Sequence, residues 1–166
     1  MEKLLIKQAT ITDIPLIKKL AMQVWPQTYT PIVGAEQVAY MLDKFYSQAS
    51  LEQQMGEKNH WFLICYSDGL PIAFASWAEL ETGIYKLHKL YIIPDQQGKG
   101  AGRAIIDYIT GQIKQLHATA LHLNVNRYND AAMAFYEKTG FASFKEEDID
   151  IGNGYYMNDY VLRLPL

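Results

Sequence analysis

The chain of 166 residues contains one cysteine, Cys65, and no apolar run approaching the length of a membrane-spanning helix. A lone cysteine excludes a disulfide within the chain and disfavours a structural zinc cluster, which needs several thiolates. We therefore predict no metal site. Because Cys65 lies inside an apolar run, we expect it to be a small buried hydrophobe and not a nucleophile.

The sequence also lacks an excess of positive charge. It has 15 Lys and Arg against 18 Asp and Glu, a formal net charge of −3. Nucleic acids and anionic membranes select basic patches, so neither is expected as a partner. Met1-Glu2-Lys3 leads into a short strand-like run without a signal-peptide core, and we expect a cytoplasmic protein. The length and the apolar content of 49% fit one domain over residues 1–166.

Hydrophobic periodicity places strands and helices along the chain. Pro26 is expected to end the first helix, and Ser50 to begin the third. Strands are predicted over residues 4–6, 61–66, 71–78, 85–93, 120–125, 141–151 and 155–164, and helices within 13–55, from 100 and from 129. This order predicts an α/β (α+β) fold, a mixed and mainly antiparallel sheet of about seven strands covered by helices.

A glycine-rich turn, Asp-Gln-Gln-Gly-Lys-Gly-Ala-Gly-Arg over residues 95–103, joins a predicted strand to a predicted helix. Glycines let the backbone approach a ligand, and the first helical turn has amide protons without partners inside the helix. Such a turn is suited to phosphates. It is not a dinucleotide fingerprint, because Arg103 replaces the third glycine, nor a P-loop, because Lys99 precedes Gly100 and not Ser or Thr.

A second motif, Asn-Asp-Ala-Ala-Met-Ala-Phe-Tyr-Glu-Lys-Thr-Gly-Phe, covers residues 129–141. Together with Gln97-x-x-Gly100-x-Gly102, and in the same order, it resembles the two signatures of the GNAT superfamily of N-acetyltransferases. The resemblance covers the chain from about Tyr85 to Phe141. It implies a GNAT fold, acetyl-CoA as cosubstrate, and direct transfer of the acetyl group to a primary amine.

The resemblance also assigns cofactor-binding residues. The backbone of Leu90, Tyr91 and Ile92 would hold the pantetheine arm, and one of these amides would polarise the acetyl carbonyl. The remaining residues that it implies for the cofactor are Gln97, Gly98, Lys99, Gly100, Ala101, Gly102, Arg103 and Asn129. Asn129 is at the same time a good helix N-cap.

Tyr136 is the proton donor that the resemblance implies for the departing CoA thiolate. Several polyamine-acetylating members carry a glutamate two positions before the pantetheine-binding triplet, where this chain has His88. Imidazole has an ordinary pKa near 6.5, so His88 is a candidate proton acceptor. A histidine that only pairs with neighbouring groups is an equally good interpretation, and Glu79 and Glu81 are alternative bases.

The acceptor is predicted from aromatic residues and a local resemblance. Trp25 and Tyr29 would form a wall for an alkylammonium group, with Glu79 beside it. The segments 25–29 and 155–159 look like those of bacterial spermidine/spermine N-acetyltransferases, so a polyamine is the first hypothesis. A protein N-terminus or lysine, and a CoA-binding sensor without turnover, are the alternatives. The exposed edges of a mixed sheet are compatible with a homodimer.

Overall fold

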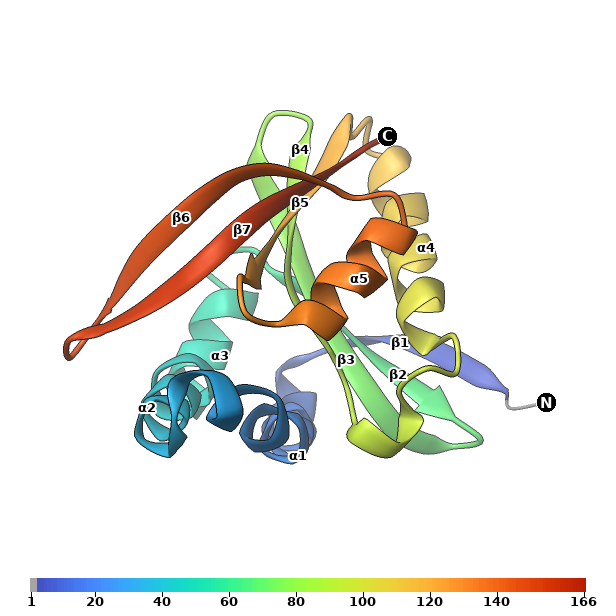
Figure 1. Ribbon diagram of the computed structural model, residues 1–166. Coiled ribbons are helices and arrows are strands. Elements are labelled where there is room, and N and C mark those ends of the chain that lie inside the picture. Colours follow the sequence, from blue (N-terminus) through green and yellow to red (C-terminus); the bar gives the residue numbers. More distant parts are fainter. Residues whose placement is uncertain (1–2) are drawn as a thin grey trace. The chain divides into compact units, whose positions relative to one another are not determined.

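A computed structural model describes residues 3–166, and the chain divides into two compact units. The first unit comprises the chain up to Ala78 together with Lys89–Ile109, and the second comprises Glu79–His88 and Thr110–Leu166. The strands form a seven-stranded sheet in the order β1-β2-β3-β4-β5-β7-β6 (Figure 1). Within residues 3–166, β4 and β5 pair in parallel, whereas β1–β2, β2–β3, β5–β7 and β6–β7 pair antiparallel, so the predicted mixed, mainly antiparallel sheet is confirmed.

The first unit holds the N-terminal strands and helices. Its elements are β1 (Leu4–Ala9), a 3-10 turn (Ile11–Asp13), α1 (Ile14–Val33), α2 (Ala35–Tyr46), α3 (Gln48–Met55), β2 (Trp61–Ser67), most of β3 (Leu70–Glu81), the end of β4 (Ile84–Ile92), a second 3-10 turn (Pro94–Gln96) and the start of α4 (Ala101–Lys114). The β2–β3 hairpin turns at Asp68 and Gly69, both at positive φ (50° and 83°), as the sequence predicts.

Helix α1 departs from the prediction, because it continues through Pro26 and Pro31 to Val33. A proline inside a helix removes a hydrogen bond and costs about 3 kcal/mol. The buried side chains of α1 include Val24 and Trp25, directly before Pro26, so tertiary packing holds the helix across the first proline. The predicted start of α3 at Ser50 is also wrong, since the Ser47 side chain caps this helix by accepting a 3.1 Å hydrogen bond from the Ser50 amide.

The second unit is dominated by strands. Beyond the ends of β3 and α4 and the start of β4, it contains β5 (Ala120–Asn126), α5 (Asp130–Lys138), β6 (Ala142–Gly152) and β7 (Tyr155–Pro165). The parallel register of β4 and β5 runs from Ile84↔Ala120 to Leu87↔Leu123. β6 and β7 form a long hairpin that turns at Asn153 and Gly154, and β7 lies between β5 and β6 (Figure 1).

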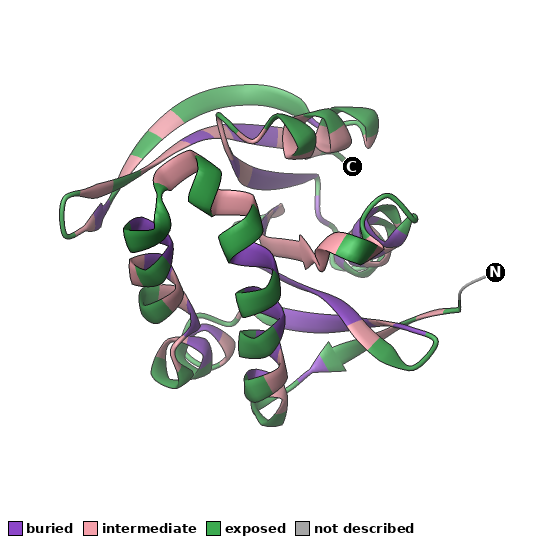
Figure 2. Cartoon of the chain, turned by 60° about the horizontal axis from the view of Figure 1, so that its bottom comes forward, coloured by how far each residue is buried: buried purple, intermediate pink, exposed green. Residues whose placement is uncertain are grey.

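Buried residues follow the inner strands and one side of several helices (Figure 2). Strand β2 is buried from Phe62 to Cys65, and α4 buries Ile105, Ile109 and Ile113. Cys65 is fully buried, as expected for a small core residue. No helix within residues 3–166 is long and apolar enough to cross a membrane.

Candidate active site

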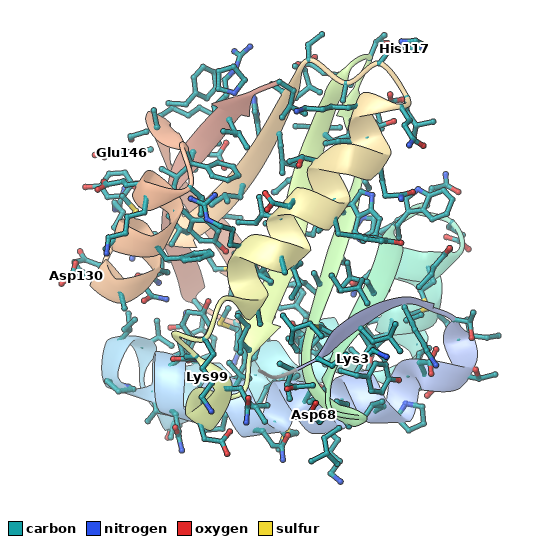
Figure 3. All side chains as sticks on the ribbon, turned by 90° about the vertical axis from the view of Figure 1, so that its right-hand side faces the viewer. Lys3, Asp68, Lys99, His117, Asp130 and Glu146 are labelled. Carbon is teal, nitrogen blue, oxygen red and sulfur yellow. The ribbon has the colours of Figure 1, made fainter. Side chains whose placement is uncertain are left out.

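The glycine-rich turn of the first unit leads directly into α4, where Figure 3 places Lys99 on the preceding loop. Gly98 and Gly100 have φ angles of 76° and 91°, which L side chains rarely adopt. Gly102 lies in the first turn of α4 and is buried. The Ala104 amide makes a helical hydrogen bond to the Gly100 carbonyl, 3.1 Å long. The amides of residues 101–103 therefore have no hydrogen-bond acceptor within the helix and can donate to a ligand.

This turn fits a diphosphate. A Cβ atom on Gly98 or Gly100 would meet no heavy atom within 4 Å, so the backbone at these positions faces open space. Gln97 donates a 3.0 Å hydrogen bond from Nε2 to the Ile92 carbonyl, which ties the turn to the end of β4. Amide donors at a helix N-terminus, reinforced by the helix dipole, are a binding site for anions.

Five aromatic residues of the first unit pack together, and we call them the aromatic cluster: Trp25, Tyr29, Tyr46, Phe74 and Tyr91. The Trp25 ring centroid lies 4.6 Å from that of Tyr29 and 5.6 Å from that of Tyr91. The hydroxyls of Tyr29 and Tyr91 are 3.3 Å apart. The structure thus brings the predicted acceptor residues Trp25 and Tyr29 against Tyr91 of the predicted pantetheine-binding triplet.

Two buried polar atoms in the aromatic cluster have no hydrogen-bond partner among residues 3–166: Trp25 Nε1 and the Tyr46 hydroxyl. Their side chains are 5% and 3% exposed. Burial raises the pKa of Tyr46 well above its ordinary value of 10.0, while the nearby Trp25 indole opposes the rise. Tyr46 therefore stays a neutral phenol at physiological pH and retains a proton to donate.

Lys89, the residue before the triplet, is held by groups that the sequence analysis missed. Its ammonium donates to Gln54 Oε1 at 2.6 Å and lies 5.5 Å from the centroid of the Tyr46 ring and 5.6 Å from that of Phe62. Gln54, 5% exposed, in turn donates to the Phe45 carbonyl. A glutamine in a short polar helix gives no periodic signal of burial, so this anchor of β4 was not predictable.

The second unit holds the second motif. Asn129 caps α5 by accepting a 3.3 Å hydrogen bond from the Ala132 amide, which confirms its predicted capping role. Tyr136 is half-buried, and its ring packs 5.2 Å from Phe135 and 5.6 Å from Phe141, centroid to centroid. These contacts fix the ring of the predicted proton donor.

His88 and Glu79 also belong to the second unit. His88 is half-buried and directly follows Leu87, the last residue of β4 in register with β5. Glu79 is exposed, and its carboxylate lies near the Tyr85 hydroxyl, whose pKa is raised first by burial and then by this neighbour.

A polar network that the sequence analysis missed lies on β5, β6 and β7. Asn124 Nδ2 donates to Glu147 Oε2 at 3.1 Å and to Asp159 Oδ2 at 3.2 Å. Glu147 and Asp159 sit directly opposite each other in the register of β6 and β7. We call these two residues the carboxylate pair. Asp159 is 4% exposed, whereas Glu147 is half-buried.

The environment separates the pKa values of the carboxylate pair. Burial raises the pKa of Asp159, and the Asn124 hydrogen bond and the Lys86 charge oppose the rise. The hydrogen bond from Lys145, 3.0 Å long, and that from Asn124 lower the pKa of Glu147. Burial lowers the pKa of Lys86, against the pull of both carboxylates.

The acidic run of β6 is partly neutralised. Arg127 bonds to Glu146, at 3.3 Å, and to Asp148, so one cation of the chain already offsets part of the charge of these two exposed carboxylates. Figure 3 shows Glu146 on this strand and Asp130 at the start of α5. Within residues 3–166, no three His, Cys, Asp or Glu side chains gather as metal ligands would.

Comparison with known proteins establishes the family. The sequence profile described as "Acetyltransferase (GNAT) domain" matches residues 29–163. An uncharacterised N-acetyltransferase of Mycobacterium tuberculosis is 27% identical over 152 residues, 92% of this chain and 97% of the relative. The chain belongs to the GNAT family of acetyltransferases and is an N-acetyltransferase.

Two further relatives are informative. The crystal structure of the PaiA N-acetyltransferase from Thermoplasma acidophilum, in complex with coenzyme A, shares the fold with a TM-score of 0.83, 22% identity and 99% coverage of both chains. The Escherichia coli peptidyl-lysine N-acetyltransferase YjaB is 36% identical over 67 residues, 40% of this chain and 42% of the relative.

Proposed function

We propose that this N-acetyltransferase moves the acetyl group of acetyl-CoA to a primary amine of a small cationic molecule, with a polyamine as the first choice. The observation that carries the proposal is the aromatic cluster, in which Trp25 and Tyr29 pack against Tyr91. Aromatic faces attract alkylammonium groups. Tyr29 and Tyr91 are half-buried, so part of each ring is open to a ligand.

Acetyl-CoA is the proposed cosubstrate. The turn from Gln97 to Arg103 would hold the diphosphate through its backbone amides, and Leu90, Tyr91 and Ile92 would hold the pantetheine arm. These three residues lie beyond the β4–β5 register, which ends at Leu87, so that ladder does not use their backbone. The coenzyme A complex of the Thermoplasma acidophilum relative supports this choice of cosubstrate.

The proposed reaction forms a C–N bond and breaks the C–S bond of the thioester. The amine nitrogen attacks the acetyl carbon, a backbone amide of the triplet stabilises the oxyanion, and Tyr136 gives its proton to the departing thiolate. An amine that arrives as ammonium must also lose a proton before attack. His88, or Glu79, is the acceptor proposed from the sequence for that proton.

A second candidate acceptor is a lysine side chain of a protein. The local similarity to the Escherichia coli peptidyl-lysine N-acetyltransferase, 36% identity over 67 residues, favours it. A lysine side chain and a polyamine present the same alkylammonium group to the aromatic cluster. They differ in whether a peptide backbone accompanies it.

Release of free CoA thiol from acetyl-CoA tests the proposal. The acceptors are spermidine, spermine, putrescine, aminoglycosides, amino acids and a lysine peptide, with a reaction without amine as the control. Turnover with a polyamine that exceeds turnover with the peptide supports the proposal. Turnover with the peptide alone contradicts the small-molecule acceptor and keeps the transferase, and binding of acetyl-CoA without any turnover supports a sensor.

A further inference from the structure

Three basic residues form one row across neighbouring strands of the second unit, and we call them the basic row: Lys86, His122 and Arg163. His122 of β5 pairs with Lys86 of β4 on one side and with Arg163 of β7 on the other. Residues that lie directly opposite each other on neighbouring strands point to the same face of a sheet. The three basic side chains therefore leave the sheet together on one face.

The middle residue of the basic row is buried without a hydrogen bond. His122 is 9% exposed, and its Nε2 atom has no hydrogen-bond partner within residues 3–166. Buried polar side-chain atoms in proteins nearly always have a partner, so an unpartnered one points to a ligand, a water or an ion. A neutral imidazole carries one N–H group, and the tautomer with this group at Nε2 can donate it to an acceptor.

The two flanking cations also have no partner side chain. Lys86 and Arg163 are half-buried, and neither side chain makes a hydrogen bond or an ion pair in the described part of the chain. Two positive charges on one face of a sheet repel each other, and partial burial without a partner adds to the cost. An anion between them would replace this repulsion by attraction.

The nearby carboxylates leave the basic row unneutralised. Glu147 and Asp159 both accept hydrogen bonds from Asn124, and they act on Lys86 through their charge alone. Asp159 and Arg163 are four residues apart on β7, roughly 13 Å along the strand. The end of the row at Arg163 is therefore remote from the carboxylate pair.

We propose that the basic row is a binding site for an oxyanion, a carboxylate or a phosphate group, which accepts hydrogen bonds from His122 Nε2, the Lys86 ammonium and the Arg163 guanidinium. The planar fork of arginine matches the oxygens of either group, and lysine supplies a point charge. Binding gives each of the three side chains a partner. The site lies wholly within the second unit and does not depend on the proposed transfer reaction.

Phe144 is the neighbour of the imidazole that can move to admit the anion. Its ring centroid lies 5.4 Å from that of His122, and the residue is 52% exposed. Phe144 stands on β6, the last strand of the sheet, where the pairing with β7 is irregular between Ser143 and Lys145. Such an irregularity redirects a side chain and interrupts the ladder locally. Movement of this exposed ring therefore disturbs little of the core.

The surrounding charges make His122 responsive to an anion. Burial lowers the pKa of His122 first, and the charge of Arg163 lowers it next. Lys145 and Lys86 act in the same direction, whereas Glu81 opposes them. The imidazole is therefore neutral near pH 7. An anion beside it favours the charged form, so binding should raise the pKa of His122.

Proton–nitrogen NMR of the histidine rings tests the proposal on the intact wild-type protein. The chain has four histidines, and the His122 signal is assigned by its absence in His122→Gln. Inorganic phosphate and succinate are titrated separately, with sodium chloride of the same ionic strength as the control. We expect a saturable shift of the His122 signal and a higher pKa with at least one anion, and the one that acts identifies the group bound. A His122 signal that responds to neither anion beyond the chloride control overturns the proposal.

Two charge-removing variants locate the site. Lys86→Met and Arg163→Met should each weaken the Kd of the anion, read from the His122 signal, by about tenfold or more, because each removes a charge-assisted hydrogen bond. Lys114→Met is the matched control, since this exposed lysine in the last turn of α4 carries the same charge. Its Kd should stay within about twofold of wild type, as expected for a screened surface charge. Equal weakening in all three variants means attraction by net charge alone and overturns the proposal.

Discussion

The two units carry different kinds of candidate functional residues. The first supplies backbone amides, glycines and aromatic rings, few of which change charge near neutral pH. The second carries Tyr136 and His88, the residues proposed to move protons, and the carboxylate pair with Lys86. We infer that the first unit determines affinity for acetyl-CoA and for the acceptor, and that the second determines rate and its dependence on pH.

Tyr136→Phe should give the largest effect and should act on rate alone. Loss of the proton donor is expected to reduce kcat by about 100- to 10,000-fold, the range for general acid catalysis. Because the ring contacts with Phe135 and Phe141 remain, the fold and the Kd for acetyl-CoA should be unchanged. Steady-state kinetics and calorimetric binding check this. A variant with a tenfold weaker Kd for acetyl-CoA and a normal kcat would contradict the assignment of affinity to the first unit and of rate to the second.

Gly100→Ala should do the reverse and weaken binding. Gly100 has a φ of 91°, which an L side chain adopts at a cost of roughly 1–2 kcal/mol, so the substituted turn should relax in the free protein. Re-forming the turn around acetyl-CoA should then weaken Kd by about tenfold. Gly111→Ala is the matched control. Gly111 lies inside α4, has no positive φ, and an added Cβ atom would meet no heavy atom within 4 Å. Equal acetyl-CoA affinity in both variants would rule out a role for the turn.

Tyr29→Phe should raise KM for the acceptor amine and leave KM for acetyl-CoA unchanged. The substitution removes the hydroxyl that lies 3.3 Å from the Tyr91 hydroxyl but keeps the ring. A neutral hydrogen bond contributes roughly 1 kcal/mol, so KM for the amine should rise about threefold to tenfold. Tyr40→Phe, on the neighbouring helix α2, is the comparison. A larger effect on KM for acetyl-CoA than for the amine would contradict the assignment.

The carboxylate pair should produce the smallest effect, seen as opposite dependences of stability on pH. A raised pKa in the folded state means that Asp159 loses stabilisation as the pH rises from its ordinary pKa through its folded one. Glu147, with a lowered pKa, stabilises above its ordinary pKa and loses this as the pH falls through its folded one. The difference in Tm between variant and wild type, measured from pH 3 to 8, should therefore change with pH in opposite senses for Asp159→Asn and Glu147→Gln. Parallel curves for the two variants would contradict opposite pKa shifts of Asp159 and Glu147.

Local signals in the sequence predicted much of this molecule. The two hairpin turns, the Asn129 cap and the glycine turn each depend on a few neighbouring residues with special backbone requirements. The aromatic wall of Trp25 and Tyr29 was predicted through the resemblance to a family, whereas its contact with Tyr91 was not predicted. The polar network was not predictable, because Asn124 and Asp159 are 35 positions apart and meet only through the register of β5 and β7. The predicted end of the first helix at Pro26 was wrong, because tertiary packing outweighs the tendency of proline to end a helix.

The order of the strands in the sheet differs from the order in which the ribosome synthesises them. The chain passes between the units after Ala78, after His88 and after Ile109, so neither unit is a single contiguous segment of the chain. β6 is synthesised before β7, yet β7 is the strand that binds β5. A nascent chain therefore holds an unpaired edge of β5 until residues 155–165 emerge. Removing those few last residues would delete an inner strand, and a truncated protein would be a ready target for proteases.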